Sequence, residues 1–276
     1  MSTEMNRDLY IIECVTNLHV GSGDNDFGLI DNRVQRDVIT GYPTINASSL
    51  KGAFASHFNN EKDKKRTKEG EAIFGRGNDT KKDEDKNFIG QGKYKFFPAN
   101  LLAIPVRSSS RPYYLVTSDQ IIEDYNEIHT LFKGEESNLK SNKDNKKENL
   151  DLEGEEVKAE KINFREKDIY VIEDKEFSKI VENLPVIARN HLDNGESKNL
   201  WYEEIVPRKS IFYFGIDKGV AEEGTKYEED FNNEILFEYK DSEGNKKGEK
   251  NIIHIGGNVT VGFGACKIMK LGDIND

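Results

Sequence analysis

Short apolar segments, rich in β-branched and aromatic residues, recur along the chain between glycine-rich turns and polar stretches. Such segments, with partial alternation of apolar and polar positions, are typical of β-strands. We therefore predict strands or extended segments over residues 8–20, 28–39, 95–106, 113–117, 210–216, 251–255 and 265–269. The turns at 21–26 and 41–43 end the first two of them.

Other segments repeat apolar residues at helical spacing. Leu50, Phe54 and Phe58 predict a helix over residues 50–58, for which Ser48 or Ser49 is a suitable N-cap. Similar patterns predict a helix over 118–132 and shorter helices at 175–183 and near 228–235.

Three stretches are dense in charge and carry few apolar residues, at about 59–93, 133–160 and 217–250. We interpret them as polar insertions or linkers outside the core. A turn-rich piece, Asp193–Ser197, lies between two apolar runs. This pattern predicts a β-hairpin over about 188–204 that reaches out from the body.

Strands separated by helices and by polar insertions favour an α+β protein with an antiparallel sheet, organised as a single domain over residues 1–276. A ferredoxin-like (RRM-like) βαββαβ core is the natural candidate.

Composition limits the classes of function. Hydrophobic residues make up 35% of the chain and charged residues 33%, with a mean hydropathy of -0.75. No apolar run is long enough to cross a bilayer and the first residues form no signal region, so we expect a cytoplasmic protein with no membrane partner. Cys14 and Cys266 are expected to be buried, reduced thiols.

The formal net charge of -11 argues by itself against a nucleic-acid partner, because phosphates are bound by clustered lysine and arginine. Net charge is a sum over the whole chain, however, whereas binding is local. Much of the acid falls in the polar stretches, so a locally basic surface is compatible with this total.

Four segments contain candidate chemistry. The first, Leu18–Gly23, brings His19 together with Gly21 and Gly23, whose backbone N–H groups could approach an anion. An ordinary turn at the end of a strand is the simpler interpretation of these glycines. His19 is either an acid–base group or a satisfied histidine at the edge of the core, and the second role is the commoner one.

The second segment, Gly28–Asp37, places Asp31 between apolar residues and the arginines Arg33 and Arg36. The carboxylate could bind a divalent cation or position a reacting hydroxyl, and the arginines could hold phosphates. A surface Asp–Arg pair is the structural alternative.

The third segment carries Ser48, Ser49, Lys51 and Gly52 at the predicted start of a helix. Free N–H groups, hydroxyls and a cation together make a phosphate site. A glycine inside a helix also suggests close approach of another backbone.

The fourth segment, Ile255–Gly264, contains Gly256, Gly257, Gly262 and Gly264. It fits a loop lying along a nucleic-acid backbone. A dinucleotide-binding turn is not indicated, because no helix follows.

The predicted hairpin adds a surface of its own. It carries Arg189, His191, Leu192 and Trp201. Apolar residues on a projecting hairpin can wedge between nucleic-acid bases; a plain surface hairpin is the alternative.

Taken together, these pieces resemble the RAMP superfamily of CRISPR proteins, and within it the repeated backbone subunit of the type III-B (Cmr) RNA-guided effector complex. The resemblance rests on the order and spacing of six segments: 18–23, 28–37, 48–52, 97–108, 201–207 and 256–264. It runs from one end of the chain to the other and skips the charged stretches. One departure is that Asn46-Ala47 stands where the family usually has Pro-Gly.

The resemblance implies a ferredoxin-like palm, a hairpin thumb, and a filament of several copies along a guide RNA with other subunits of the complex. It also implies that a loop aspartate, at the position of Asp31, cuts target RNA with the help of Mg²⁺ or another divalent cation held partly by the RNA. The Gly-rich segment 256–264 and the segment 48–52 would hold the guide backbone, and the thumb would interrupt the guide–target duplex at regular intervals. A structural RNA-binding subunit without catalysis, the equivalent subunit of a type III-A complex and a stand-alone processing ribonuclease are the alternatives.

Overall fold

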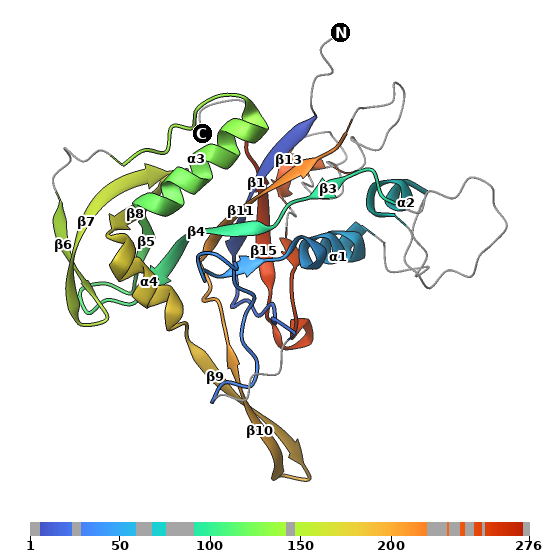
Figure 1. The fold of residues 1–276 in the computed structure, drawn as a ribbon. Coiled ribbons are helices and arrows are strands. Elements are labelled where there is room, and N and C mark those ends of the chain that lie inside the picture. Colours follow the sequence, from blue (N-terminus) through green and yellow to red (C-terminus); the bar gives the residue numbers. More distant parts are fainter. Residues whose placement is uncertain are drawn as a thin grey trace.

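The structure is a computed structural model that describes residues 6–23, 29–58, 68–75, 91–141, 147–219, 231, 238–240, 246–249 and 252–272. These residues form an α+β fold around one large sheet (Figure 1). Its neighbouring strands are antiparallel except for the parallel pair β5–β8. The order along the sheet is β14 (Ile252–His254), β15 (Ala265–Lys270), β1 (Arg7–Cys14), β11 (Ile211–Asp217), β4 (Ala99–Val106), β5 (Tyr114–Ser118), β8 (Lys167–Ile172), β7 (Glu155–Phe164) and β6 (Glu148–Leu152).

Two smaller strands extend this sheet: β2 (Thr44–Ile45) pairs with β4, and β3 (Lys95–Phe96) pairs with β11. The predicted mixture of helices with a mostly antiparallel sheet is therefore confirmed. Cys14 and Cys266 lie opposite one another on β1 and β15 as free, buried thiols, as expected.

Helices α1 (Ala47–Phe58) and α3 (Asp119–Lys133) cover opposite faces of the sheet. Neighbouring residues of β11 show this, because successive side chains of a strand point to opposite faces. The ring of Phe214 packs on Phe54 of α1, whereas the ring of Tyr213 packs on Tyr125 of α3.

Aromatic side chains fill the core on the α1 face. Phe74, from α2 (Lys68–Phe74), packs near Phe231, which is fully buried. The polar stretch 217–250 therefore supplies a core residue. The helix expected near 228–235 otherwise lies outside the described residues, as do most of 59–93 and 220–245.

The interpretation of residues 133–160 as an insertion or linker is wrong for its second half. Residues 148–160 belong to β6 and β7, which pair and form one edge of the sheet. Leu150 and Leu152 are buried, whereas Asn149 is exposed and Asp151 is half-buried. Glu153 and Gly154 adopt positive φ in the connecting turn. The polar face of this two-sided hairpin concealed the strand pattern.

Two local expectations also differ from the structure. Residues 29–39 form no regular strand and instead make isolated bridges to three other segments. Helix α1 begins at Ala47, so Ser48 and Ser49 lie in its first turn and are not its N-cap. The helix at 118–132 corresponds to α3, which follows Ser118, and the helix at 175–183 to α4 (Asp174–Glu182).

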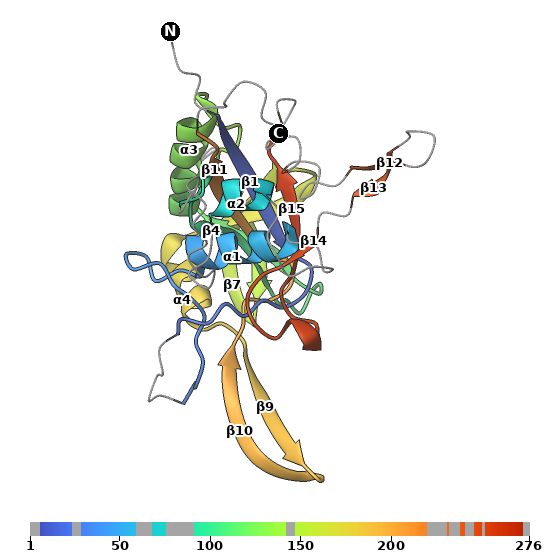
Figure 2. The same ribbon diagram turned by 90° about the vertical axis from the view of Figure 1, so that its right-hand side faces the viewer.

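A long hairpin projects from the body, away from the sheet (Figures 1 and 2). It consists of β9 (Val186–Asp193) and β10 (Glu196–Glu204), and it includes the range 188–204 predicted from the sequence. Asn194 and Gly195 connect the strands with φ of 52° and 86°, which is the backbone that a tight two-residue hairpin turn requires. A second pair, β12 (Glu238–Lys240) and β13 (Lys246–Glu249), forms a separate small sheet.

No helix within the described ranges is long and apolar enough to span a bilayer.

Candidate nucleic-acid interface

Three of the four candidate segments meet at the root of the hairpin. Leu18 pairs with Val206, which follows β10, and Asn32 pairs with Glu203 at the end of β10. The C-terminal loop, which is the segment Ile255–Gly264, joins them through Gly257, whose N–H donates to the carbonyl of His19 at 2.9 Å. Residues far apart in the sequence are thus held within hydrogen-bond distance of one another.

Asp31 is fixed to the hairpin by the backbone of Tyr202. The Tyr202 N–H donates to Asp31 Oδ2 at 2.8 Å, and the Asp31 N–H donates to the Tyr202 carbonyl at 3.0 Å. Among the described residues, Tyr202 is the only donor to this carboxylate. Asp31 is exposed, so its second carboxylate oxygen can meet a ligand from solvent.

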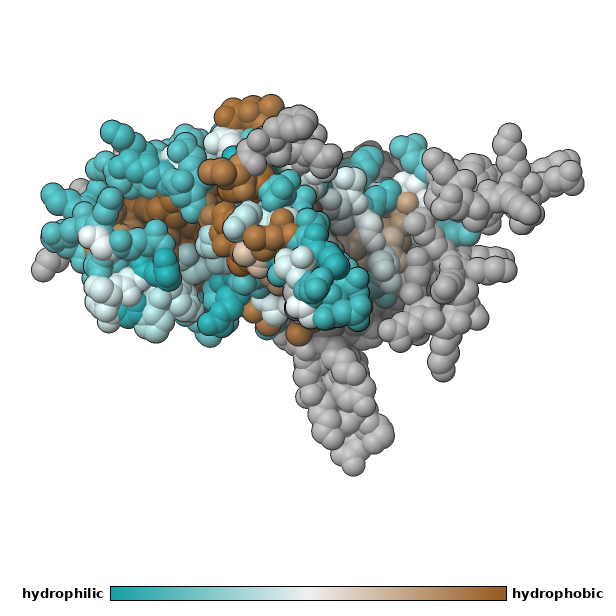
Figure 3. All heavy atoms as spheres, turned by 90° about the horizontal axis from the view of Figure 1, so that it is seen from below, coloured by the Kyte–Doolittle hydropathy of each residue, from teal (hydrophilic) through white to brown (hydrophobic). Residues whose placement is uncertain are grey.

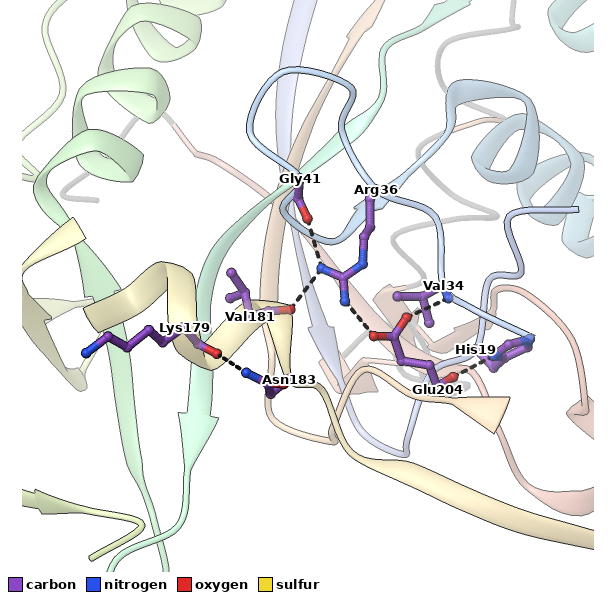
Figure 4. Close-up of polar contacts among 8 residues, drawn as sticks. All are labelled: His19, Val34, Arg36, Gly41, Lys179, Val181, Asn183 and Glu204. Carbon is purple, nitrogen blue, oxygen red and sulfur yellow. Dashed lines mark hydrogen bonds and ion pairs between the residues drawn. The ribbon is translucent and has the colours of Figure 1, made fainter. Parts of the chain in front are cut away.

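Glu204 ties the same loop to the body (Figure 4). Its side chain is 1% exposed, with Oε1 2.5 Å from Arg36 Nη2 and Oε2 accepting the Val34 N–H at 3.0 Å. Arg36 also donates to the carbonyls of Gly41 and Val181, each at 2.8 Å. The Arg36 guanidinium is therefore used inside the protein, where it positions the loop that carries Asp31.

His19 is also engaged at this root. It is 7% exposed, and its Nδ1 lies 2.7 Å from the carbonyl oxygen of Glu204. Since a carbonyl can only accept, Nδ1 carries the proton and donates it. This arrangement matches the satisfied histidine that was the commoner of the two expected roles.

Glu203 makes the corresponding connection on the other face of β10. It accepts hydrogen bonds from Trp201 Nε1 at 2.8 Å and Asn258 Nδ2 at 2.9 Å, and it pairs with Arg189 at 3.2 Å. Burial alone would raise the pKa of Glu203, but the Trp201 hydrogen bond and the charges of His19 and Arg189 outweigh it and lower that pKa. The hairpin and the C-terminal loop are thus joined through a buried anion.

The glycines of the C-terminal loop are explained mainly by packing. A Cβ on Gly256 would lie 2.3 Å from the His19 carbonyl oxygen, and one on Gly264 would lie 2.1 Å from that of Ile255. Gly262 ends the short helix η1 (Val259–Val261) with φ of 86°. A side chain does not fit at Gly256 or Gly264, and the left-handed backbone of Gly262 favours glycine, whether or not a ligand is present.

A groove lies between α1 on one side and this loop with the end of β14 on the other, with a volume of about 550 Å³. Its described lining residues include no aspartate or glutamate. They are Ser48, Ser49, Gly52, Ala53, Ser56, His57, His254, Gly256 and Val259. A Cβ on Gly52 would meet nothing within 4 Å, so packing within the chain does not require glycine there.

Gln35 orders one end of this groove. Its Nε2 donates to Ser49 Oγ and to the Gly21 carbonyl, each at 3.2 Å, and its Oε1 accepts the Asn46 N–H at 2.8 Å. The turn before α1 is therefore held by a side chain, although it lacks the Pro-Gly that the resemblance led us to expect. Lys51 is half-buried and does not line the groove.

The remaining candidates differ in burial. Gly21, Gly23, Arg33 and His191 are exposed, whereas Arg189 and Trp201 are half-buried, and the Arg189 guanidinium lies over the ring of Phe263 in the C-terminal loop. The side chain of Leu192 and residues 24–28 lie outside the described residues. The residues predicted from the sequence did not include Gln35, Glu203, Glu204 and Asn258. A weak signal was available for the two glutamates, which directly precede the apolar pair Ile205-Val206.

Comparison with known proteins gives the class. The model of the RAMP superfamily matches residues 11–267. The chain belongs to this superfamily.

Several individual relatives are named as Cmr proteins or complexes. The chain is 28% identical over 295 aligned residues to the CRISPR system Cmr endoribonuclease Cmr4 of Pyrococcus furiosus, with 92% of each chain covered. It is similar to a chain of the type III-B Cmr-beta structure in the apo state, with 26% identity, a TM-score of 0.71 and 98% of each chain covered. The crystal structure of oligomeric Cmr4 from Pyrococcus furiosus has the same fold, with 21% identity, a TM-score of 0.62, and 99% of this chain and 100% of that chain covered.

Within the described ranges, no group of three or more His, Cys, Asp or Glu side chains is arranged to hold a metal ion. Asp31 therefore offers a single carboxylate, and any cation there would need further oxygen ligands from solvent or substrate.

Proposed function

We propose that this protein is a repeated backbone subunit of a type III-B CRISPR complex. In this role it binds guide RNA, stacks with further copies and with other subunits, and cuts complementary target RNA at regular intervals. The observation that carries the proposal is the exposed Asp31 carboxylate, held by the Tyr202 backbone at the root of a projecting hairpin. A relative with 28% identity is named an endoribonuclease.

The groove between α1 and the C-terminal loop is the proposed seat of the guide backbone. The chain has 51 acidic and 40 basic residues, yet the described lining of this groove contains serines, histidines and glycines without a carboxylate. Hydroxyls, imidazoles and backbone N–H groups near a helix start suit phosphate. Gly52 fits this assignment because it keeps the groove open for a backbone to approach.

The central strands support a ferredoxin-like core as part of the proposal. Its four strands would be β1, β4, β11 and β15 in sequence order, and they lie in the order β15-β1-β11-β4 with antiparallel neighbours. This is the 4-1-3-2 order of a βαββαβ unit. Phe231, which lies between β11 and β15 in the sequence, packs on Phe54 of α1 and so contributes to the same layer as α1.

The proposed chemistry uses the RNA's own 2′-hydroxyl. Its oxygen attacks the adjacent phosphorus, the bond from phosphorus to the 5′-oxygen breaks, and a 2′,3′-cyclic phosphate forms. Asp31 receives the proton of the 2′-hydroxyl, and the leaving 5′-oxygen takes a proton from water. The hairpin would splay the target so that the 2′-oxygen stands in line with the phosphorus, which can contribute several kcal/mol.

A divalent cation such as Mg²⁺, when bound, would stabilise the charge that develops on the phosphate. Asp31 is the residue of this chain that would hold it, together with oxygens of the RNA. Because one carboxylate is a poor complete site, binding of the cation without RNA should be weak.

The test is incubation of the reconstituted complex with labelled complementary RNA, with and without Mg²⁺. We expect evenly spaced cuts that disappear with Asp31→Ala while RNA binding persists; general-base catalysis typically contributes about 10²- to 10⁴-fold. Wild-type complex that binds the RNA and leaves it whole would indicate a structural subunit. Lost assembly in the variant would make Asp31 structural.

A further inference from the structure

A pocket lies on the face of the sheet that α1 does not cover, where the turn between β7 and β8 approaches β1 and β15. Its volume is about 430 Å³, and its lining includes Ile11 of β1, Met269 of β15 and Arg165 of the turn. The pairing Ile11↔Tyr213 places the pocket on the side of the sheet where Tyr213 packs on α3. The groove beside α1 and this pocket therefore lie on opposite sides of the sheet.

Three lysines surround one carboxylate in this pocket. The side chain of Glu13 is 13% exposed, and Lys167 Nζ lies 3.1 Å from its Oε2 and 3.2 Å from its Oε1. Lys209 Nζ lies 3.6 Å from Oε1. Lys267 stands directly opposite Glu13 in the register of β1 and β15, so both side chains are on the same face. Lys167 and Lys209 are 36% and 39% exposed, and their ammonium groups can therefore be reached from solvent.

The charge of this pocket is opposite in sign to that of the whole chain. Its described basic side chains, with Lys209 beside Glu13, are Arg165, Lys167, Lys209 and Lys267, and its described acidic ones are Glu13 and Glu166. The whole chain has 40 basic and 51 acidic residues. An ammonium group has three N–H donors, and one carboxylate does not balance several such groups. The pocket can therefore bind a second anion beside Glu13.

The floor of the pocket is apolar. It consists of Ile11, Phe164, Ile211 and Met269. A thioether makes favourable contacts with aromatic rings, and a guanidinium such as that of Arg165 stacks on flat rings. The volume of the pocket lies within the range of small-molecule sites, about 300–1,000 Å³. The lining therefore suits a small ligand that has both a flat apolar part and an anionic part.

We propose that this pocket binds a nucleoside phosphate, with the phosphate at Lys167 and Lys267 and the base between Arg165 and the apolar floor. This site adds a ligand that neither Asp31 nor the groove beside α1 accounts for, and it does not depend on the proposed function. A free nucleotide and the terminal nucleotide of an RNA strand share this chemistry, and the test below separates the two.

A protein partner is a poorer match for this pocket. One partner of a stable protein interface contributes roughly 800 Å² of surface. Seen from the end where the hairpin projects, apolar patches gather near the middle of the molecule (Figure 3). A pocket of about 430 Å³ with a charged rim offers no comparable surface.

Equilibrium dialysis of the purified protein against radiolabelled adenosine 5′-monophosphate tests the proposal. A hydrogen bond to a charged group corresponds to roughly 10- to 150-fold in an equilibrium. We expect saturable binding that Lys267→Ala weakens by a factor in this range and that Lys267→Arg largely retains. Lys140→Ala removes an exposed lysine that is paired with Glu136, and as the matched control it should bind as wild type does. Urea unfolding of each variant shows whether it is folded.

Two further comparisons identify the ligand. Met269→Ala removes part of the apolar floor, so it should weaken binding of the nucleotide and leave competition by inorganic phosphate unchanged. The dialysis is then repeated with complex already assembled on guide RNA, in the presence of a short oligoribonucleotide that carries a 5′-phosphate. Competition by the oligoribonucleotide identifies the end of an RNA strand as the ligand, whereas undiminished binding of the nucleotide identifies a free nucleotide.

Three results would overturn the inference. The first is no saturable binding of the nucleotide at millimolar concentration. The second is binding that Lys140→Ala weakens as much as Lys267→Ala does, which would place the nucleotide elsewhere. The third is inorganic phosphate that competes as well as the nucleotide, which would show an anion site with no place for a base. If Lys267→Ala does not fold, the effect of Met269→Ala decides. Target cutting is measured separately, so the proposed function stands or fails independently of these results.

Discussion

The two faces of the β9–β10 hairpin are made by the same strands, yet their side chains have opposite environments. On the inner face, Arg189, Trp201 and Glu203 bind one another and reach Asn258 of the C-terminal loop. On the outer face, Leu200 and Tyr202 have about half of their surface in solvent. Only at Glu204 does the outer face turn inward, to Arg36.

This difference shows how a long hairpin can be rigid at its base and still present a surface to a ligand. Polar contacts on one side fix its direction relative to the body, while the other side keeps side chains available. A hairpin that packed on both sides would have no free surface, and one with no anchored side could not hold Asp31 in a defined place. Substitutions on each face should therefore have different effects.

The largest effect on stability is expected from Glu204→Ala. Removing one member of a buried ion pair leaves the other charge without compensation, which costs about 3–5 kcal/mol. Here Arg36 and the Val34 N–H both lose their acceptor. Urea unfolding of the free protein would measure this loss. Glu204→Gln, which keeps an acceptor, should be clearly less destabilising. If both variants lower the free energy of unfolding equally, the charge of Glu204 does not contribute to stability.

Glu203→Gln should have the next largest effect. Hydrogen bonds to a charged group contribute about 1.5–3 kcal/mol, and the amide keeps part of this network. We expect a loss of about 1–3 kcal/mol, with increased exposure of Trp201 measured by its fluorescence, since it is the only tryptophan in the chain. An unchanged fluorescence spectrum and an unchanged unfolding midpoint would contradict the claim that the inner face anchors the hairpin to the body.

The lowered pKa of Glu203 predicts that its contribution to stability depends on pH. A carboxyl group whose pKa is lowered below its ordinary value of 4.5 on folding stabilises the protein above that value, and this contribution is lost as the pH falls through the folded pKa. The difference in free energy of unfolding between wild type and Glu203→Gln should therefore shrink below about pH 4.5. Denaturant melts of both proteins at neutral and acidic pH would test it. A difference that stays constant would show that ionised Glu203 contributes nothing specific.

The smallest effect on stability is expected from Leu200→Ser on the outer face. Exposed positions away from packing usually change stability by less than about 0.5 kcal/mol. Its unfolding curve should overlay that of wild type. A loss comparable to that of Glu203→Gln would mean that both faces carry stability, and the contrast between them would disappear.

Much of the fold follows from periodicity. The stripe of apolar residues in α3 and the turn Asn194-Gly195 in the hairpin are local signals. Both the helix and the hairpin lie where the sequence predicts them. Strands β6 and β7 were missed because each exposes a charged face at the edge of the sheet. Phe231 could not be assigned to the core from the sequence, because it lies in a polar stretch and its described ring contacts, such as those with Phe54 and Tyr94, are with residues far away in the sequence.

The site could be predicted only in part. Asp31 and the start of α1 were visible as residue types in a recognisable order. The structure changed the role of Arg36, which was a candidate for phosphate and is engaged by Glu204. Glu203 and Glu204 were overlooked because buried glutamates are rare, and only tertiary partners make their burial affordable.

The central claim is that target RNA is cut at the hairpin root through its own 2′-hydroxyl, with Asp31 as the acceptor of its proton. It can be tested with target RNAs that carry a single 2′-deoxynucleotide at successive positions. We predict that each cut disappears when the deoxynucleotide lies immediately 5′ of its phosphate, while the other cuts remain, and that the normal products end in a 2′,3′-cyclic phosphate. Continued cutting at a deoxy position, with 3′-hydroxyl ends, would contradict the account.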